Sequence, residues 1–222
     1  MKKLIQGIVD FRRHVQPGYR EKFAHLALGQ RPDALFIACS DSRVVPNVFA
    51  SSNPGDLFVI RNVGNIIPPC GPDGRSESDE SEAAALEFAV LTLGVRDIII
   101  CGHSECGAMR ALLDGRAAVA SPNLRAWLRH SEPALAGVRS GQAVNPGLPP
   151  HNCLSQINVL HQLEHLRSYP FLQERARAGQ LGLHGWWFDI QHAEVYAYEE
   201  TQRRFVLIDD EEGERLLQRL TR

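Results

Sequence analysis

The sequence predicts an α/β fold, a single domain with a mostly parallel central sheet flanked by helices. Short apolar runs alternate with segments of helical periodicity, which is the pattern of a parallel sheet covered by helices. No repeat and no linker-like stretch divides the chain. Its 222 residues, 44% of them hydrophobic, are enough to fill one core.

The first part of the chain predicts a helical arm over residues 1–30. Apolar residues recur at helical spacing at Leu4, Ile5, Ile8 and Val9, which indicates an opening helix. A second helix is expected near residues 19–28.

Three continuous apolar runs predict buried parallel strands at residues 34–38, 57–60 and 97–101. The alanine-rich segment 81–94 between the last two predicts a helix. Asp79 with Glu82 would cap that helix and Gly94 would end it. After the third strand a helix is expected over 104–113, ending before Gly115.

The second half predicts a loop, a long helical region and three strands. The loop is expected at 141–150, and the helical region at 151–178 should break at Pro170. Strands are expected at 181–190, 193–198 and 203–208, the last two as a hairpin before a closing helix. We therefore expect one domain over 1–222, divided into the arm 1–30, a core 31–210 and a C-terminal helix 211–222.

The composition disfavours nucleic-acid and membrane partners. The net charge is −2, and the 21 arginines are scattered along the chain beside three lysines. No apolar stretch approaches the roughly 18 residues of a membrane span, and Asp10, Arg12 and Arg13 interrupt the only candidate for a secretory signal. Five cysteines, an odd number, favour reduced thiols in the cytoplasm, some of them free to bind metal.

Three potential metal ligands follow two predicted strands. Cys39 comes directly after the first run, and His103 and Cys106 follow the third. The carboxyl ends of parallel strands share one edge of a sheet, so these side chains should meet there. Two thiolates and an imidazole suit zinc, and three protein ligands leave the open position of a catalytic site. Taken singly, a cysteine at a strand end is more often a small core residue.

Asp41 and Arg43 strengthen the catalytic interpretation. An acid two residues after a metal-binding cysteine can reach the metal or its water, and an arginine two residues further can hold that acid ionised in a bidentate pair. In a purely structural site the two residues would be ordinary solvated loop charges.

The segments CSDSR at 39–43 and GHSECGA at 102–108 resemble the β-class carbonic anhydrases, and the similarity runs over about residues 4–208. The branch shared by plant enzymes and bacterial cyanate-associated enzymes is the most similar. The resemblance implies zinc-dependent, reversible hydration of carbon dioxide to bicarbonate and a proton by zinc-bound hydroxide. Cys39, His103 and Cys106 would bind one Zn²⁺ per chain, with Asp41 and Arg43 as a catalytic dyad.

The resemblance also implies substrate-binding residues and a homo-oligomer, either a dimer or a dimer of dimers. Gln30 would reach a neighbouring subunit's site across the dimer interface. Phe58 and Phe88 would line the carbon dioxide pocket, with Phe88 in place of the tyrosine usual in the plant branch. Gly107 would contact substrate through its backbone N–H. Members that close at low pH carry tryptophan where this chain has Phe36, so we expect an open site with Asp41 paired to Arg43.

Other interpretations stay open at this stage. The same motifs would serve a carbon disulfide hydrolase, and a non-catalytic zinc protein used for assembly is a further alternative. The physiological purpose, whether pH balance, bicarbonate supply or cyanate metabolism, is also open. Elsewhere the residues predict ordinary structural roles: a solvated helix face at His161 and His165, a hydrogen-bonded core histidine at His184, one core-facing side chain of Trp186 and Trp187, and unliganded thiols at Cys70, Cys101 and Cys153.

Overall fold

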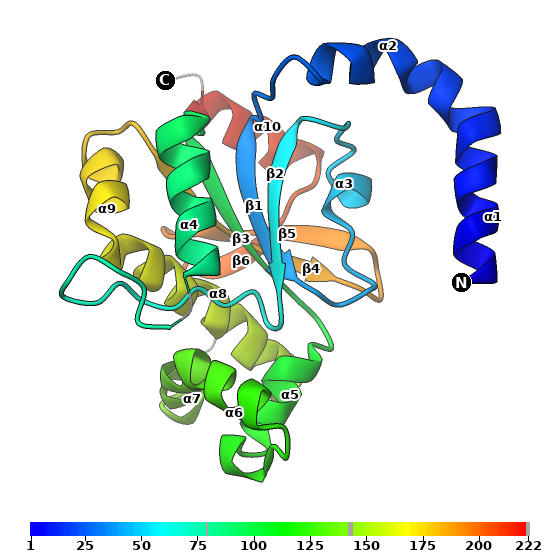
Figure 1. Cartoon of the computed structure of the whole chain (residues 1–222). Coiled ribbons are helices and arrows are strands. Elements are labelled where there is room, and N and C mark those ends of the chain that lie inside the picture. Colours follow the sequence, from blue (N-terminus) through cyan, green and yellow to red (C-terminus); the bar gives the residue numbers. More distant parts are fainter. Residues whose placement is uncertain (79, 142–143, 221–222) are drawn as a thin grey trace.

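A six-stranded sheet forms the centre of the computed structural model, which describes residues 1–78, 80–141 and 144–220 (Figure 1). The strand order is β2-β1-β3-β4-β5-β6. The first four strands are parallel, whereas β5 is antiparallel to both β4 and β6. The predicted α/β class with a mostly parallel sheet is therefore confirmed. The strands are β1 Ala34–Cys39, β2 Leu57–Asn62, β3 Asp97–His103, β4 Gly182–Asp189, β5 Glu194–Glu199 and β6 Arg204–Leu207.

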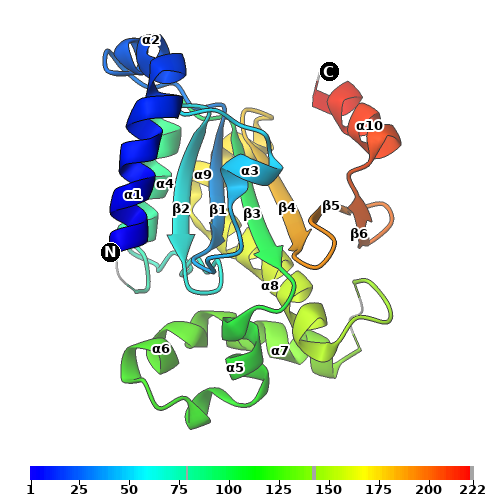
Figure 2. The ribbon, with the colours of Figure 1, turned by 90° about the vertical axis from the view of Figure 1, so that its right-hand side faces the viewer.

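Helices lie on both faces of the sheet and beyond its ends. In Figure 2, α3 lies in front of the sheet and α8 and α9 behind it. The helices are α1 Lys2–Asp10, α2 Gln16–Leu26, α3 Pro46–Phe49, α4 Ser81–Glu87, α5 Gly107–Leu113, α6 Pro122–Trp127, α7 Glu132–Arg139, α8 Pro150–Ser168, α9 Pro170–Arg177 and α10 Asp210–Leu220. Within the described ranges, none is both long and apolar enough to cross a membrane.

One sequence-based helix boundary was wrong, and another was confirmed. The segment 104–106 is a turn, because Glu105 has a φ of +59° and Cys106 is extended, so α5 begins only at Gly107. The helix expected over 81–94 is α-helical to Glu87 and continues as a π-helical turn over Phe88–Thr92, and Gly94, with a φ of +74°, follows its end as predicted. The proposed cap at Asp79 and part of the 141–150 loop, residues 142 and 143, lie outside the described residues.

Two glycines allow α8 to lie close against the sheet. A Cβ at Gly102 of β3 would stand 2.7 Å from Val159 Cγ2, and one at Gly185 of β4 would stand 3.0 Å from Val159 Cγ1. Each strand therefore has a bare backbone where the helix crosses it. The break predicted at Pro170 is confirmed, because α8 ends at Ser168 and α9 begins at Pro170.

Two apolar clusters pack on the sheet. The larger includes Trp187, which is 2% exposed. The smaller is partly aromatic: the ring centroid of Phe36 lies 5.9 Å from those of Phe49 and Trp186. The neighbouring tryptophans thus alternate as predicted, although Trp186 is half-buried and not on an open surface.

The N-terminal arm leaves its apolar residues exposed. No residue of α1, of α2 or of the π-helical turn Phe11–Val15 between them is buried. Leu4 is 65% exposed and Ile8 is 68% exposed. Figure 1 shows the arm standing away from the sheet, so nothing in the described part of the chain buries this surface.

Gly102→Ala should lower the free energy of unfolding by about 1–3 kcal/mol, because the added methyl group forces Val159 and the backbone of α8 away from β3. Thermal melting of the purified protein measures the change. Val159→Ala in the same chain should recover part of the loss. Gly213→Ala, at an open helical position, should be neutral or slightly stabilising; equal losses for both glycine variants would contradict the packing argument.

Candidate metal centre

Two cysteines and a histidine converge at the carboxyl edge of the sheet. Cys39 ends β1, His103 ends β3, and Cys106 directly precedes α5. β1 and β3 are hydrogen-bonded neighbours, so the two strand ends lie side by side. The potential ligand atoms of the three residues all lie within 4.8 Å of one another. The expectation that these side chains meet is therefore confirmed.

His103 is held in the form that a metal ligand needs. Its Nδ1 lies 2.8 Å from the carbonyl oxygen of Ser104, a contact in which the ring nitrogen donates its proton. Nε2 then carries the lone pair, and this atom is buried without a hydrogen-bond partner. An unpartnered imidazole nitrogen in a fully buried residue is costly unless a ligand satisfies it. That atom faces two thiols, so the donor set fits a zinc ion.

The pKa values of the two cysteine thiols are shifted in opposite directions. The contact with Cys106, the nearby His103 ring and the hydrogen bond from the Gly64 N–H outweigh burial and lower the pKa of Cys39 well below its usual value. Hydrogen bonding to Cys39 together with burial raises the pKa of Cys106 above its usual value. Cys39 is therefore the more readily ionised of the two thiols, and the thiolate is the form that binds a metal ion.

Asp41 faces Arg43 at the rim of the centre. Arg43 Nε donates to Oδ1 over 2.9 Å, and Nη2 donates to Oδ2 over 2.7 Å. The backbone N–H of Arg43 also donates to Oδ1 over 3.0 Å. These hydrogen bonds, the side-chain ones above all, hold the pKa of Asp41 well below its usual range. The carboxylate is therefore ionised and turned toward the guanidinium.

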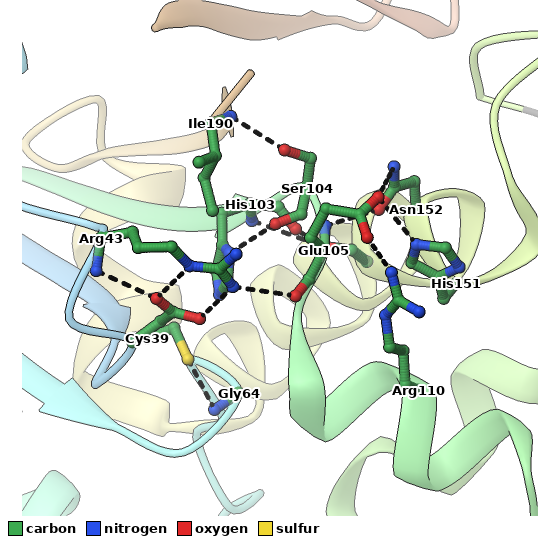
Figure 3. A network of polar contacts seen from close by, with 12 residues as sticks. Cys39, Arg43, Gly64, His103, Ser104, Glu105, Arg110, His151, Asn152 and Ile190 are labelled. Carbon is green, nitrogen blue, oxygen red and sulfur yellow. Dashed lines mark hydrogen bonds and ion pairs between the residues drawn. The ribbon is translucent and has the colours of Figure 1, made fainter.

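Arg61 and Gly64 also shape the centre, although the sequence analysis did not single them out. Arg61 donates from Nε and Nη2 to the carbonyl of Cys39 over 3.1 and 3.0 Å, and from Nη2 to that of Asp41 over 2.7 Å. Gly64 donates its N–H to Cys39 Sγ over 3.3 Å (Figure 3). The sequence did contain one indication of their role. The run at 57–60 predicts a third parallel strand, so the residues that follow it should lie at the same edge of the sheet.

A row of polar residues on α8, which we call the inner stripe, supports the loops of the centre. Ser155 donates to the carbonyl of His103 over 2.8 Å and accepts from its N–H over 3.3 Å. The four residues of the stripe are buried and recur on one helix face. They are Asn152, which contacts Glu105; Ser155; Asn158, which donates to the carbonyl of Gly64; and Gln162, which accepts from the N–H of Ile67.

Three predicted substrate residues lie away from the cluster of their own chain. Phe58 pairs with Leu35 across β1 and β2, whereas Cys39 pairs with Asn62, four residues further along. Four residues of strand span about 13 Å. Phe88 lies with Phe58, ring centroids 5.9 Å apart, and Gln30 lies exposed before β1, at the amino ends of the strands.

Gly107, by contrast, lies beside the cluster. It follows Cys106 as the first residue of α5. Apart from its chain neighbours and the nearby backbone of α5, no atom of the described residues lies within 4 Å of the place where a Cβ would stand. A small ligand could therefore approach its backbone closely.

Two expectations about other histidines were wrong in part. His161 and His165 do not form a solvated face: their ring centroids lie 4.2 Å apart, and burial lowers the pKa of His161 to about 4. His184 is hydrogen-bonded, with Nε2 2.7 Å from Asp97 Oδ1, but its side chain is one-third exposed and not in the core. Cys70, Cys101 and Cys153 are free thiols outside the cluster.

A parallel sheet whose carboxyl edge gathers two cysteines and a histidine defines an α/β protein with a candidate metal centre. Comparison with known proteins is more specific. A family model described as carbonic anhydrase matches residues 34–195. A carbonic anhydrase of Pseudomonas aeruginosa is 42% identical over 206 residues, which are 93% of this chain and 91% of that protein. Carbonic anhydrase 1 of Escherichia coli O157:H7 is 39% identical, with 93% and 91% covered.

Solved structures agree with the sequence comparison. The β-carbonic anhydrase CcaA has a TM-score of 0.86 and 41% identity, covering 93% of this chain and 98% of that one. A tetrameric β-carbonic anhydrase of Sordaria macrospora has a TM-score of 0.76 and 27% identity, covering 88% and 95%. The chain belongs to the carbonic anhydrase family, in its β class.

Proposed function

We propose that this enzyme catalyses the reversible hydration of carbon dioxide to bicarbonate and a proton, with one zinc ion held by Cys39, His103 and Cys106. The observation that carries the proposal is the buried, unpartnered Nε2 of His103 within reach of two thiols. Membership of the carbonic anhydrase family supports it. All five cysteines are free, which suits a reducing compartment, and we propose a cytoplasmic location.

Bound zinc would supply the Lewis acidity that lets water lose a proton near neutral pH. Asp41 and Arg43 would act on the attacking oxygen. An ionised carboxylate can only accept hydrogen bonds, so Asp41 would hold the remaining proton of that oxygen and direct a lone pair at the substrate. Arg43 would keep the carboxylate ionised and away from the metal. A non-catalytic zinc site would have no use for such a pair.

The apolar side of the substrate pocket would come from a neighbouring subunit. Phe58 lies about 13 Å along the strands from the cluster of its own chain. Phe88 packs beside Phe58, and Gln30 precedes β1 at the same end of the sheet. We propose that the three residues complete the site of a partner. Gly107 would contact the substrate through its backbone N–H from within the same chain.

The exposed arm supports the same oligomer. Leu4, Ile5 and Ile8 of α1 are all more than half exposed, and an apolar helix face of this kind is characteristic of an interface. We propose that the arm packs against a second copy of this chain, in a dimer or a dimer of dimers.

Replacing any one of the three metal ligands should abolish stoichiometric zinc binding. Cys39→Ser, His103→Ala and Cys106→Ser each remove one of the three donor atoms, and elemental analysis of the purified variants measures the metal. Cys70→Ser removes a free thiol outside the cluster and should retain one zinc per chain. A ligand variant with full zinc content and full activity would contradict the ligand set.

Arg43→Ala and Asp41→Asn should retain zinc but lose activity by about 100-fold, because the carboxylate is no longer both ionised and aimed. Stopped-flow hydration with a pH indicator measures the rate. The exposed Arg75→Ala, which breaks a surface pair with Glu80, is the control. Near-normal rates for both site variants would remove the pair from the mechanism.

The pH profile of the wild type adds a check. The pKa of Asp41 is lowered by its hydrogen bonds with Arg43. The ion pair is therefore intact at any pH above the usual pKa of an aspartate, and it weakens only as the pH falls through the lowered pKa. Asp41 should therefore stay ionised between about pH 5 and 8, so activity should decline there as one smooth titration of another group. Steep, cooperative loss in that range would contradict an open site.

Charges on the apolar face of α1 should dissociate the oligomer and abolish activity together. Ile5→Glu with Ile8→Glu places two carboxylates where a partner is expected, and each chain then lacks the residues its partner supplies. Sedimentation and hydration assays measure both effects. Gln6→Glu adds a charge to the same helix without removing an apolar side chain. A fully active monomer would exclude a shared site.

A further inference from the structure

Glu105 has an unusual backbone conformation between two of the potential metal ligands. Its φ of +59° is left-handed, and it lies directly before Cys106 and two residues after His103. Residues other than glycine rarely adopt this conformation. Where they do, the surroundings must hold them, and such positions gather at functional sites.

The surroundings of Glu105 hold it at its backbone and at its side chain. Its N–H donates to Asn152 Oδ1 over 2.8 Å, and Asn152 Nδ2 donates to Glu105 Oε1 over 3.3 Å. His151 Nε2 lies 3.0 Å from the same carboxylate oxygen, and Arg110 donates to the other oxygen. Two separate helices, α5 and α8, therefore anchor this one residue.

The anchored backbone presents its carbonyl to Arg43. Arg43 Nη2 donates to the oxygen of Glu105 over 3.2 Å. Within the described part of the chain, this is the only hydrogen bond of the guanidinium to an acceptor other than Asp41. Figure 3 shows Glu105 lying between Arg43 on one side and Arg110 and His151 on the other.

We propose that Glu105 is a positioning residue for Arg43, acting through its backbone carbonyl, and that Arg110, His151 and Asn152 hold it in place. The inference rests on the proposed role of Arg43 and Asp41. The Arg43 side chain is half exposed, so without this third contact the ion pair can still form but can swing as a unit. The Glu105 carboxylate points away from Arg43 and takes no direct part.

Glu105→Gly is the sharpest test, because glycine adopts the left-handed conformation easily but lacks the anchoring carboxylate. We expect kcat to fall about tenfold with KM little changed, since orientation of the pair acts on the chemical step. Zinc content and melting temperature should stay at wild-type values. Arg203→Gly is the matched control: Arg203 also has a left-handed φ, +53°, but lies in the β5–β6 turn, and its replacement should leave activity unchanged.

A second variant keeps the proposal testable if Glu105→Gly disturbs the metal. Arg110→Ala removes one anchor of the carboxylate without changing residues 103–106. It should lower kcat in the wild-type background and have no further effect when combined with Glu105→Gly, because both act through one contact. If Arg110→Ala lowers kcat equally in both backgrounds, Arg110 does not act through Glu105 and the proposal is wrong.

Combination with Arg43→Ala separates this inference from the proposed function. In a chain that already lacks the guanidinium of Arg43, Glu105→Gly should lower kcat no further. If Arg43→Ala is impaired and Glu105→Gly is fully active, the positioning role is wrong and the proposed function stands. If Arg43→Ala itself is fully active, the proposed role of the ion pair fails, and the inference fails with it.

Discussion

The candidate centre depends on the pairing of buried polar groups along the inner stripe of α8. A buried amide or hydroxyl without a partner destabilises a fold, and the four stripe residues find theirs in loops that follow the strands. Ser155 holds the backbone of His103, and Asn158 holds the carbonyl of Gly64, whose N–H reaches Cys39 Sγ. The position of one helix therefore determines where two of the three potential ligands lie.

Helix α8 can reach these loops only because it packs directly on the backbone of two strands. Gly102 and Gly185 lack the side chains that would hold α8 away from β3 and β4. Gly64, with a φ of +85°, lets the loop after β2 pass close to α5, where a Cβ would lie 3.1 Å from that of Ala108. Close packing and a set of short polar contacts thus depend on each other, and loosening one weakens the other.

Much of the architecture could be predicted, because buried parallel strands are continuous apolar runs. Residues 34–38, 57–60 and 97–101 all lie in strands, and the rule that strand ends share an edge brought Cys39 together with His103 and Cys106. The inner stripe could not be found this way. Polar residues on one helix face normally indicate solvent, and the same reasoning misplaced His161 and His165.

The turn at 104–106 was not predicted for a related reason. Its residues fit a helix by periodicity, whereas contacts with Asn152 fix the backbone at Glu105. Asn152 lies 47 residues further along the chain, so the local sequence pattern does not indicate the turn. Glu105, Asn152 and Arg61 are thus visible only once the loops are assembled.

The length of the strands separates the proposed site residues of one chain into two groups. Residues at the two ends of one parallel strand cannot meet, however the loops are arranged, because an extended backbone keeps them apart. The metal ligands lie at the carboxyl ends, whereas Phe58 and Gln30 lie toward the amino ends. If all of them serve one reaction, a second copy must supply one set. An arm without a single buried residue in its own chain is the element free to hold that copy in place. On this argument, association is a condition for building the pocket and not only a means of covering apolar surface.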